Sequence, residues 1–293
     1  MQSKYGQAYL KSLPKFDRSV SMVCWVYNER ILIEGFLRRI DELLNNTVED
    51  YEIVIVNDGS TDGTGELIEA IARENPRIRV ITSPQNENVG LASRKAIQAA
   101  TKEYLFWQTI DWSYDITNLR IFLELLKKYD VVAGVRFVPV QMRGILARPV
   151  LTLLRLVSIQ HITRRSDTAQ KAFVSVINYL LIRLLFGVPL SDFQNVVFYR
   201  TKLIQSFDYV AKSSFVNPEG LLKAHWKGAS IAEVPISCIP RQAGQAKGTR
   251  PRAIVASLKD ITRCWLNWVL LSRIDRSKKG EIQRLNAAEW GLL

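Results

Sequence analysis

Three stretches of this 293-residue chain place carboxylates and small polar side chains directly after apolar runs. They are VYNE at residues 26–29, VNDGSTDGT at residues 56–64 and QTIDWSYD at residues 108–115. Asp58, in the second stretch, can accept hydrogen bonds from a ribose or from the edge of a base. Asp111 and Asp115, in the third, could hold a divalent cation through hard oxygen ligands.

The second and third stretches also have a purely structural interpretation. In the second, Ser60, Thr61 or Asp62 could cap the helix that follows an ordinary turn. In the third, Asp115 could cap a helix while Asp111 is a turn residue. Taken alone, the second stretch leaves both interpretations open, and the spacing of Asp111 and Asp115 does not favour a metal site over the structural interpretation.

The polar stretches are expected to meet at one edge of a sheet. Short apolar runs predict strands at residues 20–26, 51–56, 78–82, 104–109 and 130–134. Apolar residues at helical spacing predict helices between them, at residues 31–44, 61–75, 91–100 and 119–128. This alternation predicts an α/β fold, with a mostly parallel sheet covered by helices on both faces. Ligands of such sheets bind beyond the carboxyl ends of the strands.

The order of these segments resembles that of the family 2 glycosyltransferases, which have the Rossmann-like GT-A fold. The resemblance covers roughly residues 20–270 and looks closest to the branch that includes dolichol- and polyprenyl-phosphate sugar synthases. It lies in SMVCWVYNE (21–29), IVIVNDGSTDGT (53–64), NVGLASRKAI (88–97), residues 105–115 and YDVVAGVR (129–136).

The resemblance implies a site for a nucleotide-sugar donor, a UDP- or GDP-sugar. Asp58 would bind the nucleotide, and Tyr27 and Glu29 would line the pocket for the base and ribose. The family's N-x-G-x-x-x-A/R segment beneath the diphosphate is matched by Asn88, Gly90 and Arg94.

A second basic segment, RQAGQAK at residues 241–247, is similar to the family's R-x-x-G-x-(S/A)-K. The resemblance implies that Arg241 and Lys247 grip the donor diphosphate or the acceptor phosphate. Fixed cations there would stabilise the charge that develops on the leaving group. The alternative is a solvated basic loop.

The family's metal motif is altered in this chain. The resemblance implies a divalent cation, Mg²⁺ or Mn²⁺, held by Asp-x-Asp after the fourth strand, but here the motif reads Asp111-Trp112-Ser113. Asp111 would still sit at the metal, and Asp115 would supply the missing carboxylate or act through water. Because a hydroxyl is a weaker ligand for a hard cation, the alternative is a metal-independent or inactive homologue.

Asp192 stands where the family has the proposed base that deprotonates or orients the acceptor in an inverting transfer. Its alternative role is to cap a helix or a turn. Gln194 and Asn195 follow it in place of the commoner Ser-Gly. Glu219 lies at the start of a predicted helix, which is a sufficient structural reason for a carboxylate there.

The charge of the chain is unevenly distributed. Its net charge is +12, from 40 basic and 28 acidic side chains. Residues 1–135 have 16 basic and 19 acidic side chains, whereas residues 136–293 have 24 and 9. The excess in the second half indicates an anionic partner: nucleic acid, a nucleotide or an anionic membrane. Nucleic acid is disfavoured, because the basic residues alternate with bulky aliphatic ones.

Residues 141–190 and 254–271 combine basic and large apolar side chains, as helices in a membrane interface do. The alternative is a packed helical subdomain or a face that forms a homo-oligomer. The chain starts with a polar segment, contains no apolar stretch of about 18 residues, and has only three widely spaced cysteines. We therefore expect a cytoplasmic protein bound peripherally to the inner face of the membrane.

These features predict an N-terminal extension (residues 1–19), a GT-A domain (20–250) with a helical insertion at about 141–190, and a C-terminal amphipathic helix and tail (251–293). The predicted activity is inverting transfer of a sugar from a nucleotide sugar to a membrane-associated acceptor, a polyprenyl phosphate or a glycolipid. Two alternatives remain open. One is a glycosyltransferase of polysaccharide or lipopolysaccharide assembly that uses a glycan acceptor, and the other is a non-catalytic, basic membrane-binding protein on the same scaffold.

Overall fold

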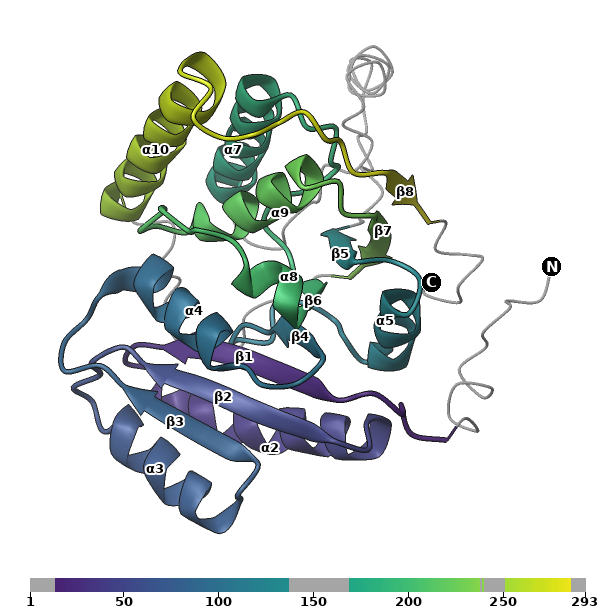
Figure 1. The fold of residues 1–293 in the computed structure, drawn as a ribbon. Coiled ribbons are helices and arrows are strands. Elements are labelled where there is room, and N and C mark those ends of the chain that lie inside the picture. The colour runs from purple at the N-terminus through teal and green to yellow at the C-terminus, as the bar shows by residue number, and fades with distance from the viewer. Residues whose placement is uncertain (1–13, 137–168, 238, 240–250, 286–293) are drawn as a thin grey trace, which may run out of the picture.

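The computed structural model describes residues 14–136, 169–237, 239 and 251–285 (Figure 1). Arg241, Lys247 and the first part of the predicted helical insertion lie outside these residues. The described part of the predicted N-terminal extension packs onto the domain. Phe16 is fully buried, and its backbone N–H donates to the carbonyl of Thr47 at 2.7 Å.

An eight-stranded sheet forms the centre of the described chain, in the order β3-β2-β1-β4-β6-β5-β7-β8. All neighbouring strands are parallel except where β6 runs antiparallel to β4 and β5. The expected mostly parallel sheet is therefore confirmed. The strands are β1 (Val20–Val26), β2 (Tyr51–Asn57), β3 (Ile78–Thr82), β4 (Tyr104–Trp107), β5 (Val131–Arg136), β6 (Val197–Arg200), β7 (Ile231–Ile236) and β8 (Ile282–Arg284).

Helices cover both faces of the sheet, as predicted (Figure 1). One face packs against α2 (Arg30–Thr47), α3 (Thr64–Glu74) and α5 (Leu119–Leu126). The other packs against α4 (Asn88–Ala99), α7 (Ala169–Phe186), α8 (Thr201–Gln205), α9 (Val216–Trp226), α10 (Pro251–Trp265) and the π-helical turn η1 (Leu266–Leu270). Alternate side chains of β1 enter the two cores, since successive residues of a strand point to opposite faces. None of the described helices is both long enough and apolar enough to cross a bilayer.

The strand order places a topological switch point between β1 and β4. From β1 the chain moves outward to β2 and β3, then returns to form β4 on the other side of β1. The crossover segments therefore diverge at the carboxyl ends of β1 and β4, which is where open α/β sheets bind their ligands. The three polar stretches follow β1, β2 and β4.

Candidate active site

The stretches after β1 and β2 are joined by hydrogen bonds. The backbone N–H of Asn28 donates to Ser60 Oγ at 3.0 Å, and the N–H of Thr61 donates to Asn28 Oδ1 at 2.8 Å. The N–H of Glu29 donates to Thr64 Oγ1 at 3.0 Å. The side chains of Tyr27 and Glu29 are half-buried. The two stretches therefore form one polar surface beyond the strand ends.

Asp58 is held at the start of α4. It is 4% exposed, and its Oδ1 accepts the backbone N–H of Glu87 at 2.8 Å. Its own N–H donates to the carbonyl of Val26 at 2.8 Å, which ties β2 to β1. Burial raises the pKa of the Asp58 carboxyl above its ordinary value. Asp58 is therefore a fixed, partly desolvated acceptor at the switch point.

Gly90 and Arg94 contact the protein itself. The N–H of Gly90 donates to the carbonyl of Lys212 at 3.1 Å, and a Cβ on Gly90 would lie 2.5 Å from the carbonyl oxygen of Ala211. Arg94 Nη2 donates to that same oxygen at 2.6 Å. Both residues thus fix the segment before α9. Asn88 is exposed and begins α4 with a φ of +72°. A role of these three in binding a diphosphate stays a prediction.

Two buried carboxylates hold the same segment, residues 210–213, which we call the anchor loop. Glu219 accepts the N–H groups of its first two residues and Asp260 those of its last two, each at 2.8 Å. Glu219 also pairs with Lys223 at 2.6 Å. The anchor loop therefore links α4, α9 and α10. Sequence reasoning explained Glu219 by its helix position and did not identify Asp260.

The stretch after β4 forms a closed turn around Asp111. Ser113 Oγ donates to Asp111 Oδ1 at 2.6 Å, and the N–H of Ser113 donates to Thr109 Oγ1 at 3.1 Å. Trp112 is only 6% exposed and packs against Phe36 of α2, with ring centroids 5.9 Å apart. The Trp112 side chain therefore lies in the core beneath the turn, whereas Asp111 and Ser113 are half-buried.

Asp115 takes part in a second turn. Its Oδ1 accepts the N–H of Thr117 at 3.0 Å and also the hydroxyl of that residue. The N–H of Asp115 donates to the carbonyl of Ser237, and the N–H of Ile239 donates to the carbonyl of Ser113, both at 3.0 Å. The chain that leaves β7 towards Arg241 thus runs beside the Asp111 turn. The turn-capping interpretation accounts for the geometry of Asp115, and its role at a metal stays a prediction.

The donor atoms of the Asp111 turn suit a hard divalent cation. Asp111 offers a carboxylate and Ser113 a hydroxyl, and the two oxygens lie 2.6 Å apart in one hydrogen bond. Within the described ranges, no group of three or more His, Cys, Asp or Glu side chains could form an all-protein metal site. Mg²⁺ fits such a sparse set, because it keeps several waters and takes further ligands from substrate phosphates.

The loop that carries Asp192 docks against β4 and its polar stretch. Asp192 is 6% exposed, and its Oδ1 accepts the N–H of Gln194 at 3.0 Å. The hydroxyl of Tyr114 donates to the carbonyl of Gln194 at 3.0 Å, and Trp107 Nε1 donates to the carbonyl of Asn195 at 3.1 Å. The structure therefore brings the Asp192 loop and the Asp111 stretch together, although about 80 residues separate them along the chain.

Glu233 of β7 and Arg284 of β8 position the Asp192 loop. Glu233 is 2% exposed and accepts both the N–H of Ser191, at 2.6 Å, and its hydroxyl, at 2.8 Å. Arg284 donates to Glu233 at 3.2 Å and to the carbonyl of Pro189 at 2.7 Å. Burial raises the pKa of Glu233. Sequence reasoning missed both residues. A carboxylate inside the apolar strand IAEVPI was the available signal, because such a group must find a partner.

Two curated relatives align with most of the chain. It is 27% identical over 264 residues to "Glycosyltransferase AglD" of Haloferax volcanii, which covers 88% of this chain and 38% of the relative. It is 26% identical over 253 residues to "Undecaprenyl-phosphate 4-deoxy-4-formamido-L-arabinose transferase" of Pseudomonas fluorescens, covering 84% and 64%. The chain thus spans less than two thirds of either relative.

Solved structures show that the fold is GT-A, as the resemblance implied. A mannosyltransferase from Pyrobaculum calidifontis, in complex with GDP-Man and Mn²⁺, matches with a TM-score of 0.56 at 16% identity, covering 91% of this chain and 74% of the other. Glucosyl-3-phosphoglycerate synthase from Mycobacterium tuberculosis, with Mn²⁺ and UDP, matches with a TM-score of 0.52 at 18% identity, covering 93% and 85%.

The family model "Glycosyl transferase family 2" matches residues 21–183, more than half of the chain. This range contains the strand-end stretches of β1, β2 and β4 and the helix α4. Together with the GT-A fold, the match shows that the chain belongs to glycosyl transferase family 2.

Proposed function

We propose that the protein is an inverting glycosyltransferase that moves a sugar from a UDP- or GDP-sugar to a membrane-associated acceptor, a polyprenyl phosphate. The observation that carries the proposal is the convergence of three loops at the switch point. These loops hold Asp58, Asp111 and Asp192. The names of the relatives support it, since one uses undecaprenyl phosphate and the neighbouring structures hold GDP-Man or UDP.

On the donor side, the residues after β1 and β2 bind the nucleoside. Asp58, fixed by the N–H of Glu87, accepts hydrogen bonds from the nucleoside, beside Tyr27 and Glu29. Asp111, with Ser113 and Asp115 in the same stretch, would hold a Mg²⁺ or Mn²⁺ ion. When bound, such an ion neutralises charge on the leaving diphosphate. Arg241 and Lys247, outside the described residues, are proposed to add positive charge there.

On the acceptor side, Asp192 orients the attacking oxygen. The N–H of Gln194 holds Asp192 Oδ1, and Glu233 holds the preceding residue, so the carboxylate has one orientation. A hydroxyl acceptor would transfer its proton to this carboxylate. A phosphate acceptor is already ionised near neutral pH, so Asp192 only has to position it.

Asp111→Asn is expected to weaken binding of the donor about tenfold, because an amide oxygen is a poorer ligand for a hard cation than a carboxylate. Calorimetry with UDP- and GDP-sugars and Mn²⁺ measures this. Asp50→Asn is the matched control, since Asp50 pairs with Lys102 on the surface, away from the site. If the wild-type protein binds no nucleotide sugar, the proposed function fails. If the wild-type protein binds a nucleotide sugar but Asp111→Asn and Asp50→Asn bind it with equal affinity, the role of Asp111 fails while the proposed function stands.

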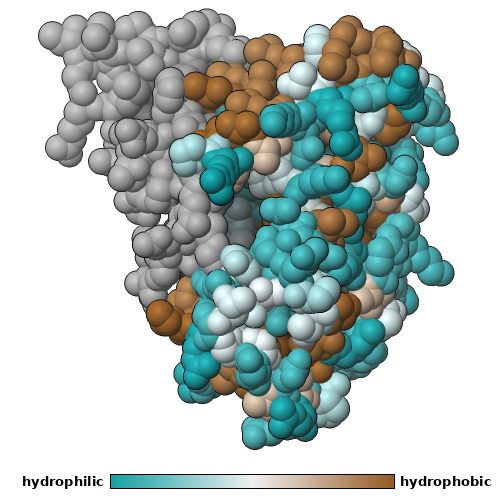
Figure 2. All heavy atoms as spheres, turned by 90° about the vertical axis from the view of Figure 1, so that its left-hand side faces the viewer, coloured by the Kyte–Doolittle hydropathy of each residue, from teal (hydrophilic) through white to brown (hydrophobic). Residues whose placement is uncertain are grey.

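The proposed membrane contact is the outer surface of α7, α10 and η1. Large apolar side chains are exposed there, with Leu184 at 79% and Leu270 at 58%. Figure 2 shows apolar side chains gathered along the upper part of the face on which α10 lies. Exposed Lys259 and Arg263 lie on the same helix. This combination of bulky apolar and basic side chains is typical of helices that lie in a membrane interface.

We expect the protein to bind anionic vesicles more tightly than neutral ones, and less tightly as salt rises, because salt screens the basic side chains. The double variant Leu266→Glu/Leu270→Glu is expected to lose most of this binding in a flotation assay. Ile31→Glu is the control, since Ile31 is 84% exposed on α2. Equal binding of the double variant and the control would contradict the assignment of this surface.

A further inference from the structure

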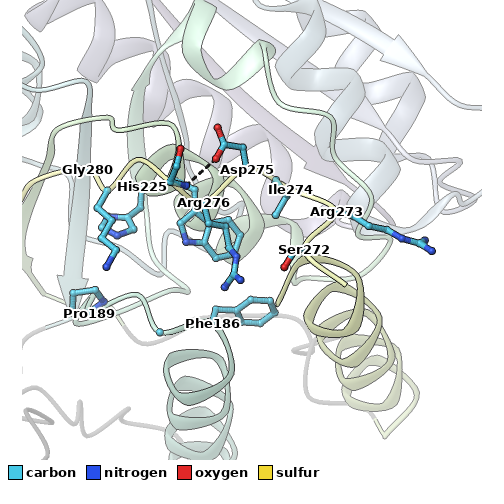
Figure 3. Close-up of a pocket in the computed structure, with 13 residues that line it drawn as sticks. Phe186, Pro189, His225, Ser272, Arg273, Ile274, Asp275, Arg276 and Gly280 are labelled. Carbon is cyan, nitrogen blue, oxygen red and sulfur yellow. Dashed lines mark hydrogen bonds between the residues drawn. The ribbon is translucent and has the colours of Figure 1, made fainter. Parts of the chain in front are cut away.

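A cavity of 1080 Å³ lies between the ends of α7 and α9 and the segment that follows η1 (Figure 3). Its lining includes no residue of the stretches after β1, β2 and β4, and from the loop that carries Asp192 it includes only Gly187 and Pro189, next to the end of α7. Because neither Asp58, Asp111 nor Asp192 lines it, the proposed transfer reaction does not use this cavity.

The lining of the cavity is basic. Arg273, Arg276 and Lys279 outnumber the single carboxylate, Asp275, whose Oδ1 already accepts the N–H of Ser277 at 2.8 Å. In Figure 3, Arg276 reaches towards Phe186 across the cavity, whereas Arg273 points outward and the Asp275 carboxylate lies on the opposite side. Arg276 thus points into the cavity, and Lys279 is a further basic residue of the lining.

Arg276 is weakly engaged by the protein. Its Nη2 donates to the carbonyl of Val269 at 3.4 Å, and its guanidinium carbon lies 5.9 Å from the ring of Trp226. A guanidinium has five N–H donors in a planar fork that matches the oxygens of a phosphate. The contacts to the described residues therefore leave most of its binding capacity for a ligand.

His225, in the wall of the cavity, has a buried polar atom that the described residues do not satisfy. The residue is 6% exposed, and its Nδ1 has no hydrogen-bond partner among them. Its carbonyl accepts the N–H groups of Gly280, at 2.7 Å, and of Gly228, at 3.0 Å, so its backbone is fixed. Nδ1 is closed off from solvent, so packing and not a hydrogen bond at this atom holds the ring in the cavity wall.

The remaining walls are aromatic and rigid. The rings of Phe186 and Trp226 lie 6.2 Å apart, and each lies 6.0 Å from the ring of Trp268 behind them. Leu270 and Leu271, each 58% exposed, directly precede the lining residue Ser272. The cavity thus offers cations inside and apolar side chains at its margin, a combination that suits an anionic group attached to an apolar body.

We propose that this cavity is a second ligand site that binds a phosphate ester through Arg276 and Lys279, beside the ring of His225 in its wall. Both cations come from the segment after η1, and the oxygens of one phosphate can accept hydrogen bonds from both. A lipid headgroup and a small soluble ester share this chemistry, and the two arms of the test separate them.

In the first arm, glycerol 3-phosphate is titrated into protein with ¹⁵N-labelled histidine. The ring signals of His225 report on this cavity and not on the donor site. We expect them to shift in the wild-type protein, and Arg276→Gln/Lys279→Gln to weaken binding at least tenfold. Arg38→Gln/Lys128→Gln is the control, with the same change of charge at two exposed positions away from the cavity. In the second arm, the same proteins bind vesicles that contain phosphatidylglycerol.

If the cavity variant, but not the control, loses binding of glycerol 3-phosphate, the site is open to soluble phosphate esters. If the cavity variant loses only the binding of phosphatidylglycerol vesicles, the ligand is a lipid headgroup. If the cavity variant and the control behave alike in both arms, or if the wild-type protein binds neither probe, the proposal is wrong. The variant Leu266→Glu/Leu270→Glu leaves Arg276 and Lys279 in place. Its effect on vesicle binding therefore reports on the apolar surface and not on the cavity.

Discussion

Asp192→Asn is expected to lower kcat about a hundredfold and to leave the affinity for the donor unchanged. The reason is positional, since misplacing a reacting group by about 1 Å can cost a hundredfold in rate. Asparagine keeps the Oδ1 acceptor that binds the N–H of Gln194, so the loop itself is expected to stay in place. Steady-state kinetics for the acceptor and calorimetry for the donor measure the two effects separately.

Asp41→Asn is a suitable control for Asp192→Asn, because Asp41 contacts Tyr51 on the opposite side of the sheet. Equal kcat for the two variants would contradict the role of Asp192. A loss of donor affinity that matches the loss of kcat would instead place Asp192 at the donor. A loss well beyond a hundredfold would favour a hydroxyl acceptor, for which general base catalysis contributes up to about 10⁴-fold.

Glu219→Ala is expected to lower the free energy of unfolding by about 3–5 kcal/mol. Glu219 is fully buried and accepts two backbone N–H groups of the anchor loop, while its ion-pair partner Lys223 is only 7% exposed at the side chain. Alanine would leave the buried Lys223 ammonium without its counterion, with only the carbonyl of Asp208 as acceptor, and the N–H groups of Val210 and Ala211 without theirs. Urea denaturation followed by circular dichroism measures the change.

Two further variants test the cause of this loss. Glu69→Ala, at an exposed position of α3, should change the free energy of unfolding by no more than about 0.5 kcal/mol. Lys223→Met in the Glu219→Ala background should recover part of the stability, because it removes the buried charge. A loss below about 1 kcal/mol for Glu219→Ala would show that water or a neighbour replaces the carboxylate.

The strands were predictable from the sequence because most of them are buried on both faces. Such strands read as continuous apolar runs, and β1 has the predicted bounds. The strand β3, which is only partly buried, also has the predicted bounds. The short strand β6 was not predicted. It is four residues long, and its place between β4 and β5 depends on antiparallel pairing with partners far away along the chain.

The part of the candidate site that directly follows predicted strands could be predicted from the sequence. The stretches around Asp58 and Asp111 do lie at the switch point, and the GT-A fold is confirmed. The hydrogen bonds of Arg94 were not predictable, because its partner Ala211 lies 117 residues away. Nor was Asp260, whose N–H partners lie 47 and 48 residues before it. Local sequence patterns carry no information about such pairings.

The reversed direction of β6 separates the two halves of the site along the chain. The residues proposed to bind the donor follow β1, β2, β3 and β4, apart from Arg241 and Lys247, which come after β7. The Asp192 loop instead precedes β6, and it reaches the same edge because β6 runs the other way. Insertions between β5 and β6 therefore leave every donor crossover unchanged. If the proposed roles hold, acceptor preference can thus diverge, in evolution or by engineering, while the proposed nucleotide-binding half stays unaltered.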